Sequence, residues 1–229
     1  MVFIFTGLIQ EMGTIINIKG NNNGKKIKIK AKKVLENASV GDSISTDGVC
    51  LTITKFSKDY FEADVMNETI ERSTLKRLSS GSLVNLEKSL TLNDFLGGHI
   101  VYGDVDCEGI IEQIRKVGIS KIYKIKFDKK YAKYIVEKGR ISIDGASLTV
   151  MNVGEDYFEV SLIPHTLEFI TICKKIVGNY VNLETDMLAK YAEKILLNVD
   201  SKLLSKNSNK DANKENSQLS VEFLRKNGF

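Results

Sequence analysis

Short runs of alternating apolar and polar residues dominate the first third of the chain. The runs are rich in Ile, Val, Thr, Phe and Tyr, and Gly, Asn and Asp separate them, a pattern typical of short antiparallel strands. Residues 25–32 read KKIKIKAK, and we interpret their lysines as the solvent-exposed face of one strand rather than as a phosphate-binding surface. About six short strands in one small unit predict a closed barrel, because closure removes exposed strand edges. The expected strands are residues 3–10, 14–19, 25–31, 43–46, 49–56 and 59–66.

The same pattern occurs twice along the chain. Residues 44–87 align without a gap onto residues 141–184, and the matching blocks include ISTDGVCLT with ISIDGASLT, two copies of DYFE and two copies of VNLE. Each unit is near the common size of a domain and too long for a solenoid repeat. We therefore predict an all-β protein of two tandem homologous six-stranded antiparallel barrels, with the first domain at 1–97 and the second at 98–184.

Helical segments are expected at equivalent places in the two copies and after the second one. ETIERSTLKRL, residues 68–78, and HTLEFITICKKI, residues 165–176, should each hold a short helix or turn. In residues 185–199, apolar residues recur at spacings of four, three and four, which predicts an amphipathic helix. A helix of about four turns is too short to be stable alone, so its apolar stripe must pack on its own barrel or on copies of itself. Residues 201–229 are interpreted as a low-complexity polar tail.

Charge and cysteine content narrow the possible classes of function. The formal net charge is +4, but residues 201–229 hold six Lys/Arg against three Asp/Glu. The rest is nearly neutral and lacks a basic stripe, so no nucleic-acid partner is expected. Cys50, Cys107 and Cys173 show no CxxC spacing, so we expect neither disulfides nor bound metal, and a cytoplasmic location. The apolar opening MVFIFTGLI is too short to span a bilayer, so no membrane association is expected.

Differences between the two copies identify candidate site residues. Within the shared pattern DG(V/A)(C/S)LT, Cys50 of the first copy corresponds to Ser147 of the second. Residues 67–69, Asn-Glu-Thr, correspond to residues 164–166, Pro-His-Thr. No nucleotide-loop glycine pattern is found, so no cofactor is expected. Equivalent pockets with different polar groups indicate two bound molecules of similar shape in unlike chemical roles.

Eight motifs resemble those of riboflavin synthases, in order and in register through both copies. The resemblance covers about residues 3–200 and leaves the tail outside; its motifs are FTGLIQEMGT, DGVCLTIT, ETIERSTL, VNLEKSL, GGHIVYGDVD, KGRISIDGASLTV, SLIPHTLE and VNLETDMLAKY. It implies two six-stranded barrels and a trimerisation helix at 185–200. It also implies a homotrimer in which the N-terminal barrel of one subunit meets the C-terminal barrel of its neighbour, and it raises lumazine synthase as a further partner.

The resemblance also implies a reaction. Two molecules of 6,7-dimethyl-8-ribityllumazine bind per site and dismutate, one giving a four-carbon unit to the other. The products are riboflavin and 5-amino-6-ribitylamino-pyrimidinedione. Carbon and electrons pass between two identical substrates, so the resemblance implies no cofactor.

The resemblance assigns substrate-binding residues to both copies. Main-chain groups at strand ends are expected to hydrogen-bond the pteridine edge, while Glu68, Thr69 and Thr166 suit the ribityl hydroxyls. The set assigned to the first pocket is Phe5, Gly7, Leu8, Ile9, Val49, Cys50, Leu51, Asp64, Val65, Met66, Asn67, Glu68 and Thr69. The set assigned to the second is Gly103, Asp104, Val105, Lys138, Ser147, Leu148, Thr149, Leu162, Ile163, Pro164, His165, Thr166 and Leu167.

The implied chemistry selects five candidate catalytic residues. A C7 methyl of one lumazine must lose a proton, and the other ring must accept a nucleophile at C7. Cys50 and Ser147 are the nucleophile candidates, and Thr149, Asp104 and Asp186 are candidates for proton handling. Asp104 stands where the family usually has histidine, and an aspartate with an ordinary pKa near 3.9 is the weaker base unless burial raises that pKa. Holding two rings in the reacting geometry can supply about 7–11 kcal/mol.

Simpler roles compete for some of these residues, and two function classes stay open. His99 is interpreted as a linker residue satisfied by the backbone, Cys107 and Cys173 as packing residues, and Asp186 as a helix cap. The first class is a catalytic riboflavin synthase, and the second is a non-catalytic lumazine- or flavin-binding relative. Intact SLT and IPHTLE in the second copy favour the enzyme, and Asp104 argues against it.

Overall fold

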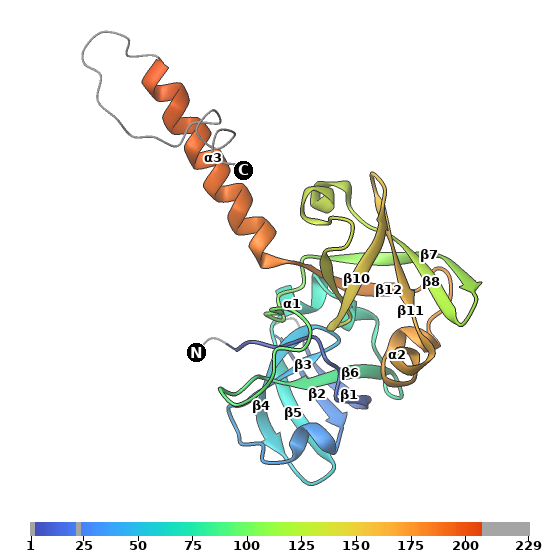
Figure 1. Ribbon diagram of the computed structural model, residues 1–229. Helices are drawn as coiled ribbons and strands as arrows, with labels where there is room; N and C mark the ends of the chain where they lie inside the picture. Colours follow the sequence, from blue (N-terminus) through green and yellow to red (C-terminus); the bar gives the residue numbers. More distant parts are fainter. Residues whose placement is uncertain (1–2, 22–23, 208–229) are drawn as a thin grey trace. The chain divides into compact units, whose positions relative to one another are not determined.

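The computed structural model describes residues 3–21 and 24–207 and contains two closed antiparallel barrels (Figure 1). This confirms the predicted fold class. The first barrel consists of β1 (Glu11–Asn21), β2 (Gly24–Lys30), β3 (Ser43–Thr46), β4 (Val49–Phe56), β5 (Tyr60–Val65) and β6 (Leu83–Lys88). The second consists of β7 (Cys107–Val117), β8 (Ser120–Lys126), β9 (Arg140–Ile143), β10 (Ala146–Val153), β11 (Tyr157–Leu162) and β12 (Tyr180–Thr185).

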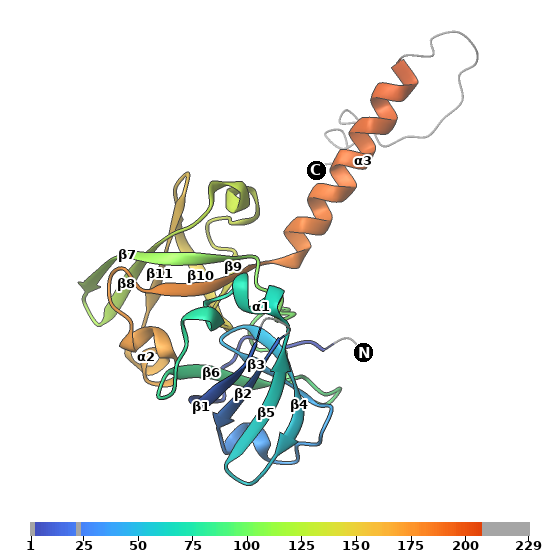
Figure 2. The same cartoon turned by 180° about the vertical axis from the view of Figure 1, so that it is seen from behind.

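Both barrels close with the same strand order, and Figure 2 shows the two barrels from behind. Around the first barrel the order is β1-β2-β5-β4-β3-β6, and the second repeats it with the equivalent strands. In β2, Ile27 and Ile29 are buried while Lys26 and Lys30 are exposed. This confirms that the lysines form the solvent-exposed face of the strand. Burying each such apolar side chain contributes about 1.5–3 kcal/mol.

The expected strand at residues 3–10 is wrong. In that segment only Phe5 forms a bridge, with Val101, and the first barrel strand begins later, at Glu11. The sixth strand is instead β6, which contains the first VNLE block. Phe5 is fully buried where this segment crosses to the other barrel, whereas Leu8 is 51% exposed and lines a pocket. The hydrophobicity of residues 3–10 therefore reflects this crossing and not a place in a sheet.

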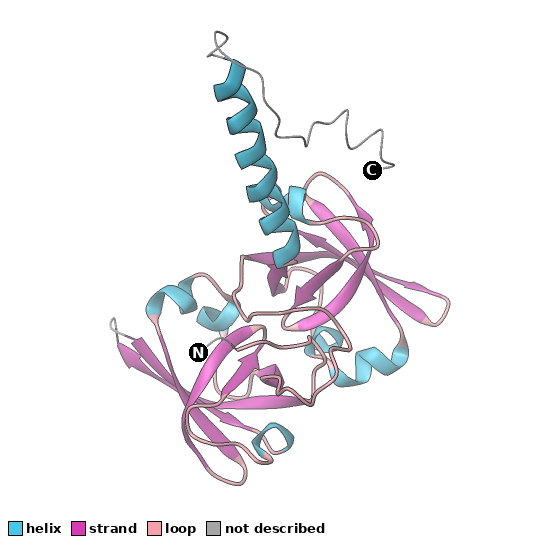
Figure 3. Cartoon of the chain, turned by 60° about the vertical axis from the view of Figure 1, so that its left-hand side comes forward, coloured by secondary structure: helices cyan, strands magenta, loops and turns pink. Residues whose placement is uncertain are grey.

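Short helical segments lie between the strands, in cyan in Figure 3. Both predicted helical regions are confirmed, as α1 (Asn67–Glu71) with a 3₁₀ turn at Thr74–Arg77, and α2 (Pro164–Phe169) with one at Thr171–Lys174. Further 3₁₀ turns occupy Lys33–Leu35 and Lys129–Tyr134.

The last helix, α3 (Met187–Asn207), is longer than predicted and includes the first residues of the expected tail. The Asp186 side chain accepts a hydrogen bond from the Leu188 N–H at 3.0 Å, as a cap does. Within the described residues, none of the helices combines the length and apolarity needed to cross a membrane. The rest of the predicted tail, 208–229, lies outside the described residues.

A mirrored hydrogen-bond network joins the two barrels. The Asn85 N–H donates to Asp47 Oδ1 at 2.7 Å, and the Asn182 N–H donates to Asp144 Oδ1 at 2.7 Å. Each asparagine Nδ2 also crosses to the other barrel, Asn85 to the carbonyl of Asp144 and Asn182 to the carbonyl of Asp47, both at 2.8 Å. These residues come from the DG and VNLE blocks of the repeat, so the duplicated sequence builds its own junction.

Lys175 breaks the symmetry of this junction. Its Nζ lies 2.6 Å from Asp144 Oδ2, and the equivalent residue in the first copy is Leu78. Asp47 therefore has no adjacent cation of its own. Burial, reinforced by the charge of Asp144, raises the pKa of Asp47 to about 8. Asp47 thus holds a proton at neutral pH.

This proton makes stability depend on pH. The unfolded chain releases it near the ordinary aspartate pKa and the folded chain only near pH 8, so the free energy of unfolding falls as pH rises between these values. One proton gives a slope of at most about 1.4 kcal/mol per pH unit. We expect Asp47→Asn to flatten the dependence in urea unfolding at pH 5, 6, 7 and 8. A slope equal to that of the unmodified protein would show that Asp47 titrates normally.

Candidate active site

Two pockets lie where the start of each copy crosses to the other barrel. The first, of about 300 Å³, is lined by Val49, Met66, Glu68, Thr69, Arg72 and Ser73 of the first copy and by Gly103, Asp104 and Val105. The second, of about 580 Å³, is lined mainly by second-copy residues, among them Ser147, Thr149, His165 and Phe169, and by Gly7–Gln10 and Lys33. Each pocket therefore takes one wall from the other copy.

This exchange corrects the predicted grouping of the substrate-binding residues. The Ser147 N–H donates to the Gly7 carbonyl at 2.8 Å, and the Cys50 N–H donates to the Gly103 carbonyl at 3.0 Å. Gly7, Leu8 and Ile9 thus belong with Ser147, and Gly103–Val105 belong with Cys50. The repeat alignment identifies equivalent segments but does not determine which barrel each segment contacts, so the grouping by copy was wrong.

Two buried glutamates, Glu87 and Glu184, hold the crossing segments. Glu87 accepts hydrogen bonds from the N–H groups of Thr6 at 2.7 Å and Gly7 at 2.9 Å. Glu184 accepts from the N–H groups of Tyr102 at 2.7 Å and Gly103 at 3.0 Å. Burial raises the pKa of both carboxyls, that of Glu184 to about 7. The sequence analysis did not assign them to the site, although the repetition of VNLE was a signal for both.

Because each crossing segment contacts the other barrel, we expect a substitution at Gly103 to affect the first pocket and one at Gly7 to affect the second. Gly7 and Gly103 have φ of +75° and +79°, and an added Cβ would lie 2.5 Å from Ser147 Cβ and 2.7 Å from Cys50 Cβ, respectively. We expect Gly103→Ala to weaken lumazine binding in the first pocket about tenfold, since left-handed strain alone costs about 1–2 kcal/mol, and Gly7→Ala to spare it. The measurement is lumazine protection of Cys50 against iodoacetamide, followed by peptide mass mapping. Loss of protection only in Gly7→Ala would restore the grouping by copy.

Ser147, which lines the second pocket, forms a close polar pair with the buried His99. His99 Nδ1 lies 2.7 Å from Ser147 Oγ, and burial lowers the pKa of His99, so the imidazole is neutral at pH 7. A Cβ at Gly98 would collide with the Thr6 carbonyl, so only glycine there allows this approach. The interpretation of His99 as a linker residue satisfied by the backbone is therefore wrong, because its ring contacts a site hydroxyl.

Cys50 is hydrogen-bonded to Gly103 of the first pocket through its main chain but is not among the lining residues, and its environment differs from that of Ser147. Burial raises the pKa of its thiol, and the charge of Asp104 adds to the rise, so the thiol is protonated at neutral pH and a poor nucleophile. Asp104 is exposed, lines the first pocket and has no side-chain hydrogen bond or ion pair with a described residue. The free carboxylate of Asp104 in the first pocket thus lies near an unactivated thiol.

The remaining predicted catalytic residues differ in position. Thr149 lines the second pocket and pairs across the strands with Arg140. Asp186 caps α3 and is not among the lining residues of either pocket, although its charge acts on His99. Its role as a cap is the one that the contacts support.

Several predicted binding residues have buried side chains. The buried side chains are those of Phe5, Leu51, Val65, Leu148 and Leu162, none more than 7% exposed. Phe5 lines neither pocket, so its substrate-binding role stays a prediction. Lys138 is exposed at the turn before β9 and also lines neither pocket. Leu8, Met66, Glu68, Ile163, His165 and Thr166 are lining residues of the pockets, as are the buried Leu148 and Leu162, whereas Asn67, Pro164 and Leu167 are not.

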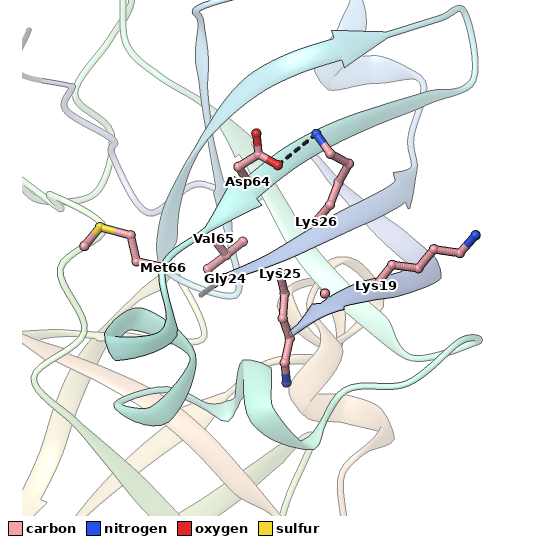
Figure 4. A pocket seen from close by; sticks show the side chains of 8 residues that line it. Lys19, Gly24, Lys25, Lys26, Asp64, Val65 and Met66 are labelled. Atoms are coloured by element: carbon pink, nitrogen blue, oxygen red, sulfur yellow. Dashed lines mark ion pairs between the residues drawn. The ribbon is translucent and has the colours of Figure 1, made fainter. Parts of the chain in front are cut away.

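A third depression, of about 430 Å³, lies beside β1, β2 and β5 and contains three lysines (Figure 4). Lys26 is paired with Asp64 at 2.8 Å, and Figure 4 shows Lys19 and Lys25 pointing away from each other. The cations do not converge as an anion site requires. Asp64, predicted to bind substrate, thus has its carboxylate in an exposed ion pair here.

Comparison with known proteins places the chain in a family. The lumazine-binding domain family matches residues 6–89 and 102–186. The riboflavin synthase of Actinobacillus pleuropneumoniae is 43% identical over 226 residues, which cover 99% of this chain and all of that protein. The chain belongs to the riboflavin synthase family. Because that alignment includes most of residues 201–229, the interpretation that the tail lies outside the resemblance is wrong.

Other relatives agree with this assignment. The riboflavin synthase of Bacillus subtilis is 38% identical over 99% of this chain and all of that protein, and that of Schizosaccharomyces pombe is 35% identical over 84% of this chain and 94% of that protein. A crystal structure of LumP complexed with 6,7-dimethyl-8-(1'-D-ribityl) lumazine aligns with a TM-score of 0.72 at 23% identity, covering 80% of this chain and 99% of that one. At this identity the similarity supports the fold alone.

Proposed function

We propose that the chain is a riboflavin synthase that dismutates two molecules of 6,7-dimethyl-8-ribityllumazine into riboflavin and 5-amino-6-ribitylamino-pyrimidinedione. The observation that carries the proposal is a pair of equivalent pockets with unlike polar groups, in a chain 43% identical over nearly its whole length to a riboflavin synthase. Two similar cavities suit two identical substrates, and different side chains suit the different fates of the two.

The described side chains can bind the substrates and move protons. The apolar wall that includes Leu8, Ile163 and Phe169 can cover a flat ring, and Thr69 and Thr166 can bind ribityl hydroxyls. Ser147 and neutral His99 form a hydroxyl–imidazole pair of the kind that transfers protons in general acid–base catalysis. A general base of this kind contributes about 10²–10⁴-fold in rate.

A non-catalytic lumazine or flavin carrier is the second candidate function. Asp104 in place of the usual histidine favours it, since that aspartate is exposed and unpaired. The Ser147–His99 pair and the two lined pockets favour the enzyme, because a carrier needs one binding site and no proton relay.

Conversion of the lumazine to riboflavin distinguishes the enzyme from the carrier. Purified full-length protein given only 6,7-dimethyl-8-ribityllumazine should produce the absorption and fluorescence of riboflavin without an added cofactor. One pyrimidine should form for each riboflavin. Tight binding without any riboflavin would select the carrier.

The proposed assembly is a homotrimer in which the N-terminal barrel of one subunit faces the C-terminal barrel of another. Taken by itself, α3 exposes Leu188, Tyr191 and Ile195, spaced three and four residues apart. This apolar stripe suits packing between copies of the helix. Association with lumazine synthase, which would supply the substrate, and a cytoplasmic location belong to the same proposal; the free thiols of Cys50, Cys107 and Cys173 fit that location.

A further inference from the structure

The two pockets carry opposite charge. The charged lining residues of the second pocket are Lys33 and Arg140, with no carboxylate among its lining residues. The first pocket is lined by Glu68, Arg72 and Asp104. Glu68 and Arg72 neutralise each other in an ion pair at 2.9 Å, which leaves Asp104 as the uncompensated charge.

Arg140 is the main source of the difference. It starts β9 opposite Thr149, and the equivalent pair in the first barrel is Ser43 with Thr52, whose hydroxyls lie 3.3 Å apart. Neither Arg140 nor Lys33 has a side-chain hydrogen bond or ion pair with any described residue. Two uncompensated cations therefore lie beside the pocket that contains Ser147.

The pockets also differ in their walls. His165 and Phe169 on α2 form an aromatic contact with ring centroids 5.0 Å apart. Their equivalents in the first copy are Glu68 on α1 and Arg72 directly after it, the ion pair of the first pocket. The second pocket is thus larger and aromatic as well as cationic, and it suits a ring that gains both negative charge and size during reaction.

We infer that the second pocket holds the lumazine that loses a C7-methyl proton and receives the four carbons, with Arg140 and Lys33 stabilising its anion, while the first pocket holds the lumazine that gives them up. This inference rests on the proposed function. It assigns Arg140 as a binding residue for the anion, whose charge is delocalised onto the ring carbonyl oxygens. Electrostatic stabilisation of developing charge by a fixed cation is effective because the cation needs no reorganisation.

The step balances within the pair of substrates. The methyl C–H bond breaks, its proton passes to Ser147 Oγ while the Ser147 proton passes to His99 Nδ1, and the electron pair stays on the ring. The two methyl carbons of this ring then form bonds to C6 and C7 of the ring in the first pocket, whose C–N bonds break with the electron pairs leaving on nitrogen. The hydrogens that the methyl groups lose equal those that the departing pyrimidine gains.

Ionisation of bound lumazine tests the inference without turnover. Loss of the methyl proton changes the conjugation of the ring, so absorption follows it during a pH titration of lumazine bound to the Ser147→Ala variant. We expect one of the two bound rings to ionise at least one pH unit below free lumazine, a tenfold shift in its acid constant. Adding Arg140→Met should remove most of this shift, and Lys33→Met part of it, whereas Lys121→Met, an exposed lysine on β8 outside both pockets, should leave it unchanged.

The groups that face the bound ring in the second pocket and can influence its ionisation are Lys33, Arg140 and His165, with His99 and Asp186 behind Ser147. Their own titration is subtracted with the ligand-free variants. An acid constant unchanged by Arg140→Met, in a protein that converts lumazine, overturns the pocket assignment alone. Failure of the unmodified protein to convert lumazine overturns the proposed function.

Discussion

Ser147→Ala should lower kcat for riboflavin formation by about 10²–10⁴-fold, the range that a positioned proton-transfer group contributes. Ser147 is the only described hydroxyl that contacts His99, and its removal leaves the imidazole without a relay to the substrate. Lumazine affinity should change little, because the walls and main-chain groups of the pocket stay in place. Steady-state kinetics and fluorescence titration of the same preparation separate the two effects.

The comparison with Cys50→Ser makes this prediction specific. Cys50 occupies the equivalent position, but burial and the charge of Asp104 raise the pKa of its thiol, and no described imidazole is hydrogen-bonded to it. We therefore expect the variant to retain at least about a tenth of the activity, well above the range for a lost proton-transfer group. Ser120→Ala, at the start of β8 and outside both pockets, is the neutral control. A larger loss in Cys50→Ser than in Ser147→Ala would move the proton-transfer chemistry to the first pocket.

Asn182→Ala should cause a large loss of stability, because it removes two buried hydrogen bonds at the barrel junction. The side chain accepts from the Thr74 N–H at 2.7 Å and donates to the Asp47 carbonyl at 2.8 Å, both buried. Each buried group left without a partner costs about 1–3 kcal/mol, so the free energy of unfolding should fall by about 2–6 kcal/mol in urea titrations at pH 7.

Two further substitutions serve as controls for the loss of stability in Asn182→Ala. Asn85→Ala removes the mirrored contacts, with the Thr171 N–H and the Asp144 carbonyl, and should cost a similar amount. Asn179→Ala removes an exposed turn hydrogen bond to the Ile176 N–H and should cost about 0.5–1.5 kcal/mol, as a single exchanged hydrogen bond does. If Asn182→Ala costs no more than Asn179→Ala, the network does not hold the barrels together.

Local patterns in the sequence predicted the barrels well. Alternation gave β3 and β4 with the bounds that the structure has, and the duplication gave the equivalence of Cys50 with Ser147. Such features depend on neighbouring residues, whose periodicity is visible in the chain. The strand expected at 3–10 was wrong because this segment crosses between the barrels, with Phe5 buried and Leu8 exposed. Such a crossing leaves no periodic signal in the sequence.

Contacts between the copies could not be predicted in this way. The pairing of Gly7 with Ser147 spans the two copies, and the repeat is equally compatible with either arrangement. His99 reaches Ser147 only because Gly98 permits a close backbone approach, a property of three-dimensional packing. Lys175 belongs to no recognised motif, and its effect on the junction depends on Asp47 and Asp144, which the fold brings near it.

The central claim is that each chain presents two lumazine sites that act as a pair. The most direct measurement is an equilibrium titration of the Ser147→Ala variant with 6,7-dimethyl-8-ribityllumazine, followed by fluorescence at a protein concentration well above the dissociation constants. The account predicts saturation at two lumazines per chain. Saturation at one lumazine per chain would contradict it.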